Sequence, residues 1–150
     1  MENEELRVRK LEIIDKNKGF IELLQQLSEC NSISDDEFGE RFEEIAKYGN
    51  DHVICVIEDV SKSKIVATGS VLIEKKFIRK CGKVGHIEDV VVDSNQRGSR
   101  LGKNVIDFLV DHACSMGCYK VILDCVDKNI PFYEKCGFKQ KEIQMVKYFV

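Results

Sequence analysis

Proline, long apolar runs and metal-binding cysteine pairs are scarce or absent in this sequence. Pro131 is the only proline, and ten glycines are scattered through the 150 residues, so no stretch has the composition of a linker or a disordered tail. Apolar stretches such as 53–57 and 90–92 have the length of strands, and we expect no integral membrane contact. The first ten residues, MENEELRVRK, lack the apolar core of a signal peptide, so we expect a cytoplasmic protein.

The charge balance and the cysteines exclude further classes. The net charge is −3, which argues against a general nucleic-acid binder. The seven cysteines are odd in number, and we expect them to be reduced thiols. Cys114 and Cys118 lie four apart near His112, but a second pair of zinc ligands is missing. Small buried apolar residues are the better interpretation of these cysteines, and we expect no metal.

Hydrophobic periodicity predicts one α/β (α+β) domain over residues 1–150. Ser34 begins one predicted helix with a capping box, because Glu37 follows three residues later. The order of elements predicts a single mixed sheet flanked by helices. Strands are predicted near residues 6–13, 53–57, 65–73, 84–92, 119–126 and 144–149, and helices near 20–28, 34–49, 101–117 and 131–135.

The loop before the long helix has the features of an anion site. Free N–H groups and the positive end of a helix converge where a strand leads through a loop into a helix. Gly98 and Gly102 let the backbone approach a ligand closely. Arg97, Arg100 and Lys103 add positive charge. The segment therefore predicts a phosphate site.

Two nucleotide-type interpretations of this loop do not fit its residues, and one ordinary interpretation stays open. A P-loop needs G-x-x-x-x-G-K-[ST], but Gly98 and Gly102 are one residue too close together and Asn104 replaces the Ser or Thr. A dinucleotide fold needs G-x-G-x-x-G, which is absent. An ordinary basic loop is the third interpretation, since short loops with glycine and arginine are common.

Four segments carry a resemblance to a known family. The loop RGSRLG at 97–102 resembles the pyrophosphate loop R-x-x-G-x-G/A of the GNAT acetyltransferases, with Arg100 at the middle glycine. Backbone donation survives that change if the position needs no positive φ. The segments HIEDVVV, GCYKVILDC and FYEKCGF, at 86–92, 117–125 and 132–138, resemble the eukaryotic glucosamine 6-phosphate N-acetyltransferases, and the resemblance spans nearly the whole chain.

The resemblance implies a fold, a reaction and an assembly. The fold would be GNAT-like, a mixed, mostly antiparallel sheet with a splayed central strand pair. The reaction would be acetyl-CoA-dependent N-acetylation of D-glucosamine 6-phosphate in UDP-N-acetylglucosamine biosynthesis, by direct attack of the amine on the thioester. The assembly would be a homodimer in which the C-terminal strand contacts the other subunit.

The resemblance also implies the residues that bind the cofactor. The Val90 N–H would hold the thioester oxygen, as an oxyanion donor does. Tyr133 would protonate the leaving thiolate; its alternative is a core tyrosine beside Phe132. The implied cofactor site consists of Val90, Val91, Val92, Arg97, Gly98, Ser99, Arg100, Leu101, Gly102, Lys103, Tyr133, Glu134 and Lys135.

The substrate site is partly predicted from the residues. Asp124 lies within an apolar run, a costly place for an unpaired charge, and we expect it to orient the amine and accept its proton. The basic connector at 75–83 would hold the phosphate, unless it is a solvated turn. Alternation puts Glu88 and Asp89 on opposite faces unless a bulge intervenes. The implied substrate site consists of Ser28, Lys75, Lys76, Phe77, Ile78, Arg79, Glu88, Asp89, Val90, Tyr119, Lys120 and Asp124.

Three further points stay open in the sequence. In a regular strand Lys120 faces away from Tyr119, so contact of both with one ligand would imply a backbone contact or a partner subunit. His86 is the one histidine next to the predicted site, where it would support a substrate ligand. A GNAT enzyme for another amine and a non-catalytic acyl-CoA sensor are the alternative functions, and a turnover assay with thiol detection separates them.

Overall fold

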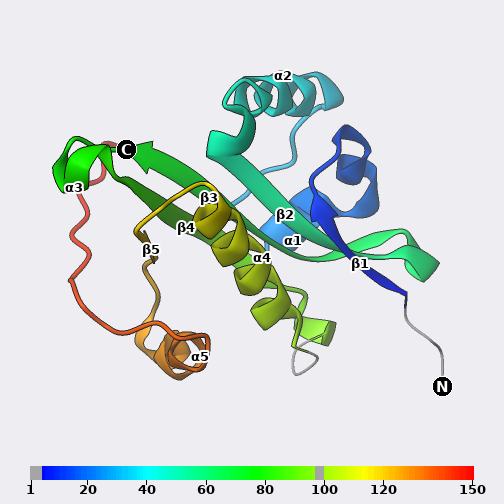
Figure 1. Cartoon of the computed structure of the whole chain (residues 1–150). Helices are drawn as coiled ribbons and strands as arrows, with labels where there is room; N and C mark the ends of the chain where they lie inside the picture. Colours follow the sequence, from blue (N-terminus) through cyan, green and yellow to red (C-terminus); the bar gives the residue numbers. More distant parts are fainter. Residues whose placement is uncertain (1–4, 97–99) are drawn as a thin grey trace.

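A sheet of five strands organises the chain, whose computed structural model describes residues 5–96 and 100–150. The spatial order is β1-β2-β3-β4-β5 (Figure 1). Neighbours are antiparallel except β4 and β5, which are parallel, so the predicted mixed, mostly antiparallel sheet is confirmed. The strands are β1 (Leu6–Lys10), β2 (His52–Asp59), β3 (Lys64–Lys75), β4 (Lys83–Val92) and β5 (Lys120–Ile122).

Helices flank this sheet on both faces. The long helix α4 crosses one face, and α1 and α2 lie toward the other (Figure 1). The capping box predicted at Ser34 is confirmed: the Glu37 N–H donates to Ser34 Oγ at 3.1 Å, and the Ser34 N–H donates to Glu37 Oε1 at 3.0 Å. The helices are α1 (Phe20–Leu24), α2 (Asp35–Ala46), α3 (Ile78–Cys81), α4 (Leu101–Ser115) and α5 (Ile130–Lys135).

The sheet is buried on both faces, which gives the chain two apolar clusters. Along β2, Cys55 and Ile57 belong to the cluster that contains Val105 of α4. Val56, between them, belongs to the cluster that contains Phe20 of α1 and Phe38 of α2. Residues of both parities are therefore apolar, which explains why the central strands read as continuous hydrophobic runs rather than as alternating patterns.

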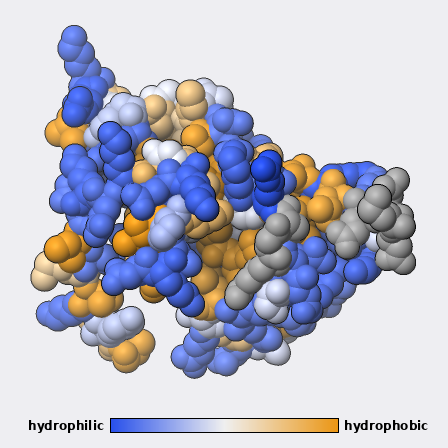
Figure 2. Space-filling view, turned by 90° about the horizontal axis from the view of Figure 1, so that it is seen from below, coloured by the Kyte–Doolittle hydropathy of each residue, from blue (hydrophilic) through white to orange (hydrophobic). Residues whose placement is uncertain are grey.

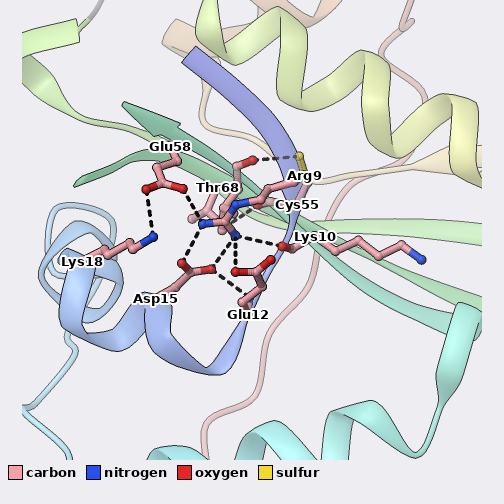
Figure 3. Close-up of polar contacts among 9 residues, drawn as sticks. Arg9, Lys10, Glu12, Asp15, Lys18, Cys55, Glu58 and Thr68 are labelled. Atoms are coloured by element: carbon pink, nitrogen blue, oxygen red, sulfur yellow. Dashed lines mark hydrogen bonds and ion pairs between the residues drawn. The ribbon is translucent and has the colours of Figure 1, made fainter. Parts of the chain in front are cut away.

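A network of ion pairs fixes the edge strand β1 (Figure 3). Arg9 donates from Nη1 and Nη2 to the two carboxylate oxygens of Asp15 at 2.8 Å each, and Asp15 is fully buried. Arg9 also donates to Glu58 Oε1 of β2 at 2.8 Å, and Lys18 donates to Glu58 Oε2 at 2.9 Å. These hydrogen bonds lower the pKa of Glu58. Bidentate, charge-assisted pairs of this kind hold one geometry, so the network ties β1, the 3-10 turn Ile13–Lys18 and β2 together.

Two predicted strands are wrong in extent. The strand predicted at 119–126 is reduced to Lys120–Ile122. The strand predicted at 144–149 has no partner strand among the described residues, and its apolar side chains are exposed, with Phe149 at 90%. A strand requires an edge to which its backbone can bond, and within the described residues the C-terminal segment pairs with none of the sheet's open edges. No helix among the described residues combines the length and apolar character that a membrane crossing requires.

Candidate active site

A bulge in β4 shapes the candidate site. The register between β3 and β4 shifts at Gly69, so that Asp89 and Val90 of β4 both face this one glycine. Asp89 takes up the extra residue in the left-handed conformation, with φ 53°. A bulge of this kind bends the strand and changes the direction of its backbone groups. Regular alternation therefore stops here, and Glu88 and Asp89 do not have to face apart.

Close packing against α4 holds this bulge in place. A Cβ atom on Gly69 would lie 2.7 Å from Val105 Cγ1 of α4 and 3.2 Å from Val90 Cγ2. Only glycine fits at this distance, because contacts between carbon atoms prefer about 3.5–4.0 Å. Helix α4 therefore lies directly on β3, and the Val90 side chain packs against the same glycine, next to the bulge.

Strands β4 and β5 separate beside the bulge. β5 pairs with residues 84–86 of β4, so the side of β4 from Ile87 to Val92 that faces β5 has no strand partner among the residues that the structure describes. The predicted splayed strand pair is confirmed in this arrangement. Figure 2, which views the molecule from below, shows a hollow whose floor is hydrophobic and whose walls are largely hydrophilic. An open strand edge in such a hollow can donate backbone hydrogen bonds to an extended ligand.

The N-terminus of α4 lies at the end of β4, as predicted, while Arg97, Gly98 and Ser99 lie outside the described residues. The first intrahelical bond runs from the Asn104 N–H to the Arg100 carbonyl at 3.0 Å. The N–H groups of residues 101–103 therefore have no intrahelical acceptor, which favours an anion. Lys103 bonds to Asp107 at 2.7 Å, and this hydrogen bond raises the pKa of Lys103.

Arg100 adopts a conformation that glycine would prefer. It precedes α4 with φ 65° and ψ 11°, in the left-handed region. The condition stated from the sequence, that this position needs no positive φ, is therefore not met, and Arg100 itself adopts the positive φ. A left-handed non-glycine residue costs about 1–2 kcal/mol. Arg100 is the N-cap residue of α4, so this cost falls on a residue that brings a positive charge to the start of the helix.

Tyr133 reaches the same region from α5. Its ring packs edge-on against Phe132, at 4.9 Å between centroids, and against Phe138, at 6.0 Å. Burial raises the pKa of the phenol, and the phenol forms no hydrogen bond with any described residue. A Cβ on Gly102 would lie 3.0 Å from Phe132 Cζ, so this glycine lets α5 approach the start of α4. The half-buried ring packs as a core tyrosine does, while its hydroxyl stays available, so the role of proton donor stays a prediction.

Three carboxylates gather at the mouth of the splayed strands. Burial, reinforced by the charges of Asp89 and Asp124, raises the pKa of Glu88. Asp124 accepts a hydrogen bond from Gln144 Nε2 at 3.0 Å. It lies beyond β5 and is exposed, so our argument from a charge inside a strand was wrong, although the residue does lie at the site. Such a group attracts a cation, and an ammonium is the cation that fits the predicted chemistry.

The remaining members of the predicted cofactor site have ordinary surroundings. The Val91 side chain is buried in the cluster with α1, and the Val92 side chain packs on the α4 face. Leu101, the first residue of α4, is buried in the same cluster as Val105. Glu134 and Lys135 lie exposed on α5 and make no ion pair with any residue that the structure describes. For Val91 and Val92 the backbone is thus the part that remains for a ligand.

The basic connector contains a left-handed helical turn. Arg79, Lys80 and Cys81 have φ values of 55°, 55° and 58°. Two hydrogen bonds close the turn, from the Cys81 N–H to the Phe77 carbonyl and from the Gly82 N–H to the Ile78 carbonyl, both at 3.0 Å. Three successive left-handed residues without a glycine are unusual, and strain of this kind concentrates at functional sites.

Only part of the predicted phosphate cluster is available. Lys75 pairs with Asp51 at 3.1 Å, and Lys76 pairs with Glu74 at 3.4 Å. Lys83 donates to the Met116 carbonyl at 3.1 Å. Within residues 5–96 and 100–150, Arg79, Lys80 and Lys120 make no ion pair, and Phe77 and Ile78 are exposed beside them at 94% and 61%. Among the predicted phosphate ligands, the cations without an ion pair are therefore those on the turn and at the start of β5.

The expectation that Tyr119 and Lys120 face apart is wrong. Tyr119 precedes β5, so strand alternation does not apply to it. Lys120 Nζ lies 5.8 Å from the centroid of the Tyr119 ring, and the Arg79 guanidinium lies 5.2 Å from it. His86, predicted as a supporting residue, contacts Glu74 Oε1 through Nε2 at 2.8 Å rather than one of the three carboxylates at the mouth of the splayed strands.

The predicted substrate residues fall into two groups at opposite ends of β4. The Arg79–Tyr119 group adjoins Lys83, at the start of the strand, and the group around Val90 lies seven residues further on. Strands rise about 3.3 Å per residue, so roughly 20 Å separates the groups. Ser28 follows α1 and is exposed. It lies toward the Val90 end of β4, since its near neighbour Gln26 accepts the Ser94 N–H through Oε1 at 3.0 Å.

Sequence reasoning missed three glycines that shape the site: Gly69, Gly82 and Gly102 as a packing residue. A glycine inside a predicted strand is a known signal for a bulge or a close approach, so Gly69 could have been found. Among the described residues no group of three or more His, Cys, Asp or Glu side chains is arranged to hold a metal ion.

A bulged strand with an open edge, a splayed partner and a helix that begins beside it define an acyl-CoA-dependent acyltransferase. Residues 19–138 match the model of the acetyltransferase (GNAT) family, and the chain belongs to this family. GNAT enzymes use acetyl-CoA as the co-substrate.

Named relatives narrow the comparison. Glucosamine 6-phosphate N-acetyltransferase of Arabidopsis thaliana is 66% identical over 146 residues, which cover 97% of this chain and 98% of that protein. Glucosamine 6-phosphate N-acetyltransferase 1 of Dictyostelium discoideum is 49% identical, with 93% and 88% covered. The crystal structure of glucosamine-6-phosphate N-acetyltransferase from Arabidopsis thaliana matches with a TM-score of 0.97 at 66% identity, with 98% and 100% covered.

Proposed function

We propose that this chain transfers the acetyl group of acetyl-CoA to the 2-amino group of D-glucosamine 6-phosphate. The observation that carries the proposal is the open, bulged edge of β4 at Asp89–Val90, with α4 beginning at one end and three carboxylates at its mouth. The 66% identity to a glucosamine 6-phosphate N-acetyltransferase over 97% of the chain supports the choice of substrate.

The residues around Val90 have the chemistry that this transfer needs. Main-chain N–H groups of α4 and the guanidinium of Arg100 fit the pyrophosphate of the cofactor. The Val90 N–H donates to the thioester oxygen, where negative charge grows as the amine attacks. The new C–N bond forms while the C–S bond breaks. Asp124 accepts the proton that the amine loses, and Tyr133 donates a proton to the departing sulfur.

The raised pKa of Tyr133 suits this role. A donor must hold its proton at the working pH, and burial keeps the phenol protonated through neutral and mildly alkaline solution. The acidic mouth suits the other half of the reaction. Glu88, Asp89 and Asp124 attract the protonated amino sugar, whose ammonium gives one proton to solvent to become a neutral amine. Asp124 then accepts the second proton, which the nitrogen loses after its attack on the thioester.

The unpaired cations suit the phosphate of the substrate. Arg79, Lys80 and Lys120 are free of intramolecular ion pairs in the described part of the chain. We infer that they bind the phosphomonoester, with Arg79 as the bidentate donor. The lysines at 75, 76 and 83 have other partners and act on the phosphate only through the local positive potential.

The distance between the two groups supports a homodimer. Roughly 20 Å of strand lies between Val90 and Lys83, which adjoins the Arg79–Tyr119 group, and this is longer than one hexosamine phosphate. We therefore propose that the basic turn of one subunit completes the acetyl-transfer site of the other. The C-terminal segment supports a subunit contact: Ile143, Met145, Val146, Tyr148 and Phe149 are all exposed in the isolated chain. Figure 2 has hydrophobic side chains along the margin where this segment lies in Figure 1.

Release of free thiol from acetyl-CoA tests the reaction. Glucosamine 6-phosphate is compared with unphosphorylated glucosamine, a polyamine and a peptide with a free N-terminus. The proposal predicts turnover with a strong preference for the phosphorylated sugar. Turnover with another amine would reassign the substrate, and cofactor binding without any turnover would indicate an acyl-CoA sensor.

Mixed dimers test the shared site. Two copies of the chain with different affinity tags are co-expressed. One copy carries Asp124→Asn and the other carries Arg79→Ala. If sites are shared, half of the dimers are mixed and each has one intact site of two, so activity returns to about a quarter of the wild-type value. If each chain holds a whole site, every site carries one defect and no activity returns. A monomer with full activity, measured by light scattering, would contradict the dimer.

A further inference from the structure

We propose that Tyr119 is a positioning residue that holds the Arg79 guanidinium toward the substrate phosphate, and that Gly82 provides the space in which the Tyr119 ring lies. The inference rests on the phosphate-binding role proposed above for the basic turn. It concerns how that turn is kept in order when none of its free cations has an acidic partner.

Arg79 has one partner in the described chain, and that partner is a ring. The guanidinium carbon lies 5.2 Å from the centroid of the Tyr119 ring, within the range of a cation–π contact. A guanidinium that stacks by its face keeps its N–H donors free at the edge. An acidic partner would occupy those donors, whereas the ring orients them and leaves them for an anion.

Gly82 makes the contact sterically feasible. A Cβ at this position would lie 2.9 Å and 3.0 Å from Cδ1 and Cε1 of Tyr119, and 3.1 Å from Cβ of Arg79. The glycine thus lies between the two partners, and any side chain would push them apart. Its own backbone is fixed, because the Gly82 carbonyl accepts the Lys76 N–H at 2.8 Å.

The backbone on either side fixes the other two components. Tyr119 donates its N–H to the Lys83 carbonyl at 2.9 Å, which anchors the ring beside the start of β4. The left-handed conformation at Arg79 directs the arginine across the turn toward that ring. Lys120 lies 5.8 Å from the same ring. The ring therefore holds two cations that would otherwise repel each other at one anion site.

The test measures KM and kcat for glucosamine 6-phosphate, and kcat/KM for glucosamine, in wild type, Tyr119→Leu, Tyr119→Phe, Arg79→Ala and Tyr119→Leu with Arg79→Ala. Loss of the ring raises KM for the phosphorylated sugar about two- to fivefold and affects kcat less. The preference for the phosphorylated sugar falls by the same factor. Phenylalanine keeps the ring and restores most of the loss. In the Arg79→Ala background, Tyr119→Leu has a clearly smaller effect, because Arg79 is already gone and only Lys120 still contacts the ring.

Gly82→Ala is the second variant, with Gly39→Ala as its matched control. A Cβ on Gly39 meets nothing within 4 Å, so Gly39→Ala keeps the wild-type KM, while Gly82→Ala raises KM in the same direction as Tyr119→Leu. Melting temperatures identify any variant that fails to fold. The inference would be overturned if Tyr119→Leu changed KM by the same factor with and without Arg79, or if it lowered kcat/KM equally for both sugars. Wild-type turnover of glucosamine 6-phosphate would still support the proposed function in that case. Absence of wild-type turnover would overturn both.

Discussion

Gly69→Ala should damage the acetyl-transfer site from beneath. The added methyl would lie 2.7 Å from Val105 Cγ1 and 3.1 Å from Leu109 Cδ1. Carbon contacts prefer about 3.5–4.0 Å, so α4 and β3 must move apart by roughly 1 Å. Overpacking of this kind costs about 1–3 kcal/mol, which lowers the melting temperature by about 2–4 °C per kcal/mol. The same movement displaces the backbone of Val90, and a misplacement of about 1 Å reduces kcat by about a hundredfold.

The assay combines thermal unfolding with steady-state release of thiol. Gly39→Ala is the matched control, because its methyl enters open space on α2 and should leave activity unchanged and stability equal or higher. Val105→Ala with Gly69→Ala is the compensating pair: removal of Cγ1 makes room for the new methyl, so the two changes together cost at least about 0.5 kcal/mol less than their sum. Wild-type stability and kcat in Gly69→Ala would refute the claim that the helix fixes the bulge.

Three further predictions follow from the structure. Tyr133→Phe should lower kcat by about a hundredfold or more with little change in KM for the sugar, as stopped-flow thiol release would measure. Because burial raises the pKa of Tyr133, the wild-type phenol should stay protonated, and active as a donor, at pH values above the ordinary phenol pKa. Arg100→Gly should raise the melting temperature, because glycine adopts the left-handed conformation without strain, and the gain in the free energy of unfolding is at most about 1 kcal/mol after the entropy of glycine is counted. The same change should weaken acetyl-CoA binding in calorimetry. A lower melting temperature together with weaker binding would contradict the strain argument. Arg9→Met should cost about 3–5 kcal/mol at neutral pH in urea unfolding, because it leaves the buried Asp15 without its cation and Glu58 with Lys18 alone. Because Arg9 and Lys18 lower the pKa of Glu58, the stabilisation that Glu58 contributes is present above its ordinary pKa of 4.5 and is lost as the pH falls below it, so the difference from wild type should shrink in acid.

Local signals in the sequence predicted much of the fold. The capping box at Ser34, the amphipathic face of α4 and the apolar runs of β2 and β3 depend on near neighbours in the chain, and all three were found as predicted. The strand that was predicted at 144–149 failed for the opposite reason. Its pattern is apolar and extended, but whether a strand forms depends on pairing with the edge of another strand, which the segment's own residues do not specify.

The sequence predicted which residues belong to the candidate site, but it did not predict how these residues are arranged in space. The bulge at Asp89 depends on the distance between Gly69 and Val105, residues that are far apart in the sequence and meet only after folding. The left-handed turn at Arg79–Cys81 involves residue types that rarely adopt a positive φ, so no propensity predicts it. The availability of each cation also depended on tertiary partners, such as Asp51 for Lys75.

A crystal structure of the chain with acetyl-CoA and with the unreactive product N-acetylglucosamine 6-phosphate tests the central claim most directly. The account predicts that the acyl oxygen lies within about 3.1 Å of the Val90 nitrogen and the sulfur beside the Tyr133 hydroxyl. It also predicts the diphosphate at the first turn of α4 and the sugar phosphate on Arg79 of the partner subunit. Acetyl-CoA bound away from the open edge of β4, or a sugar phosphate held by the same chain's acidic mouth, would contradict it.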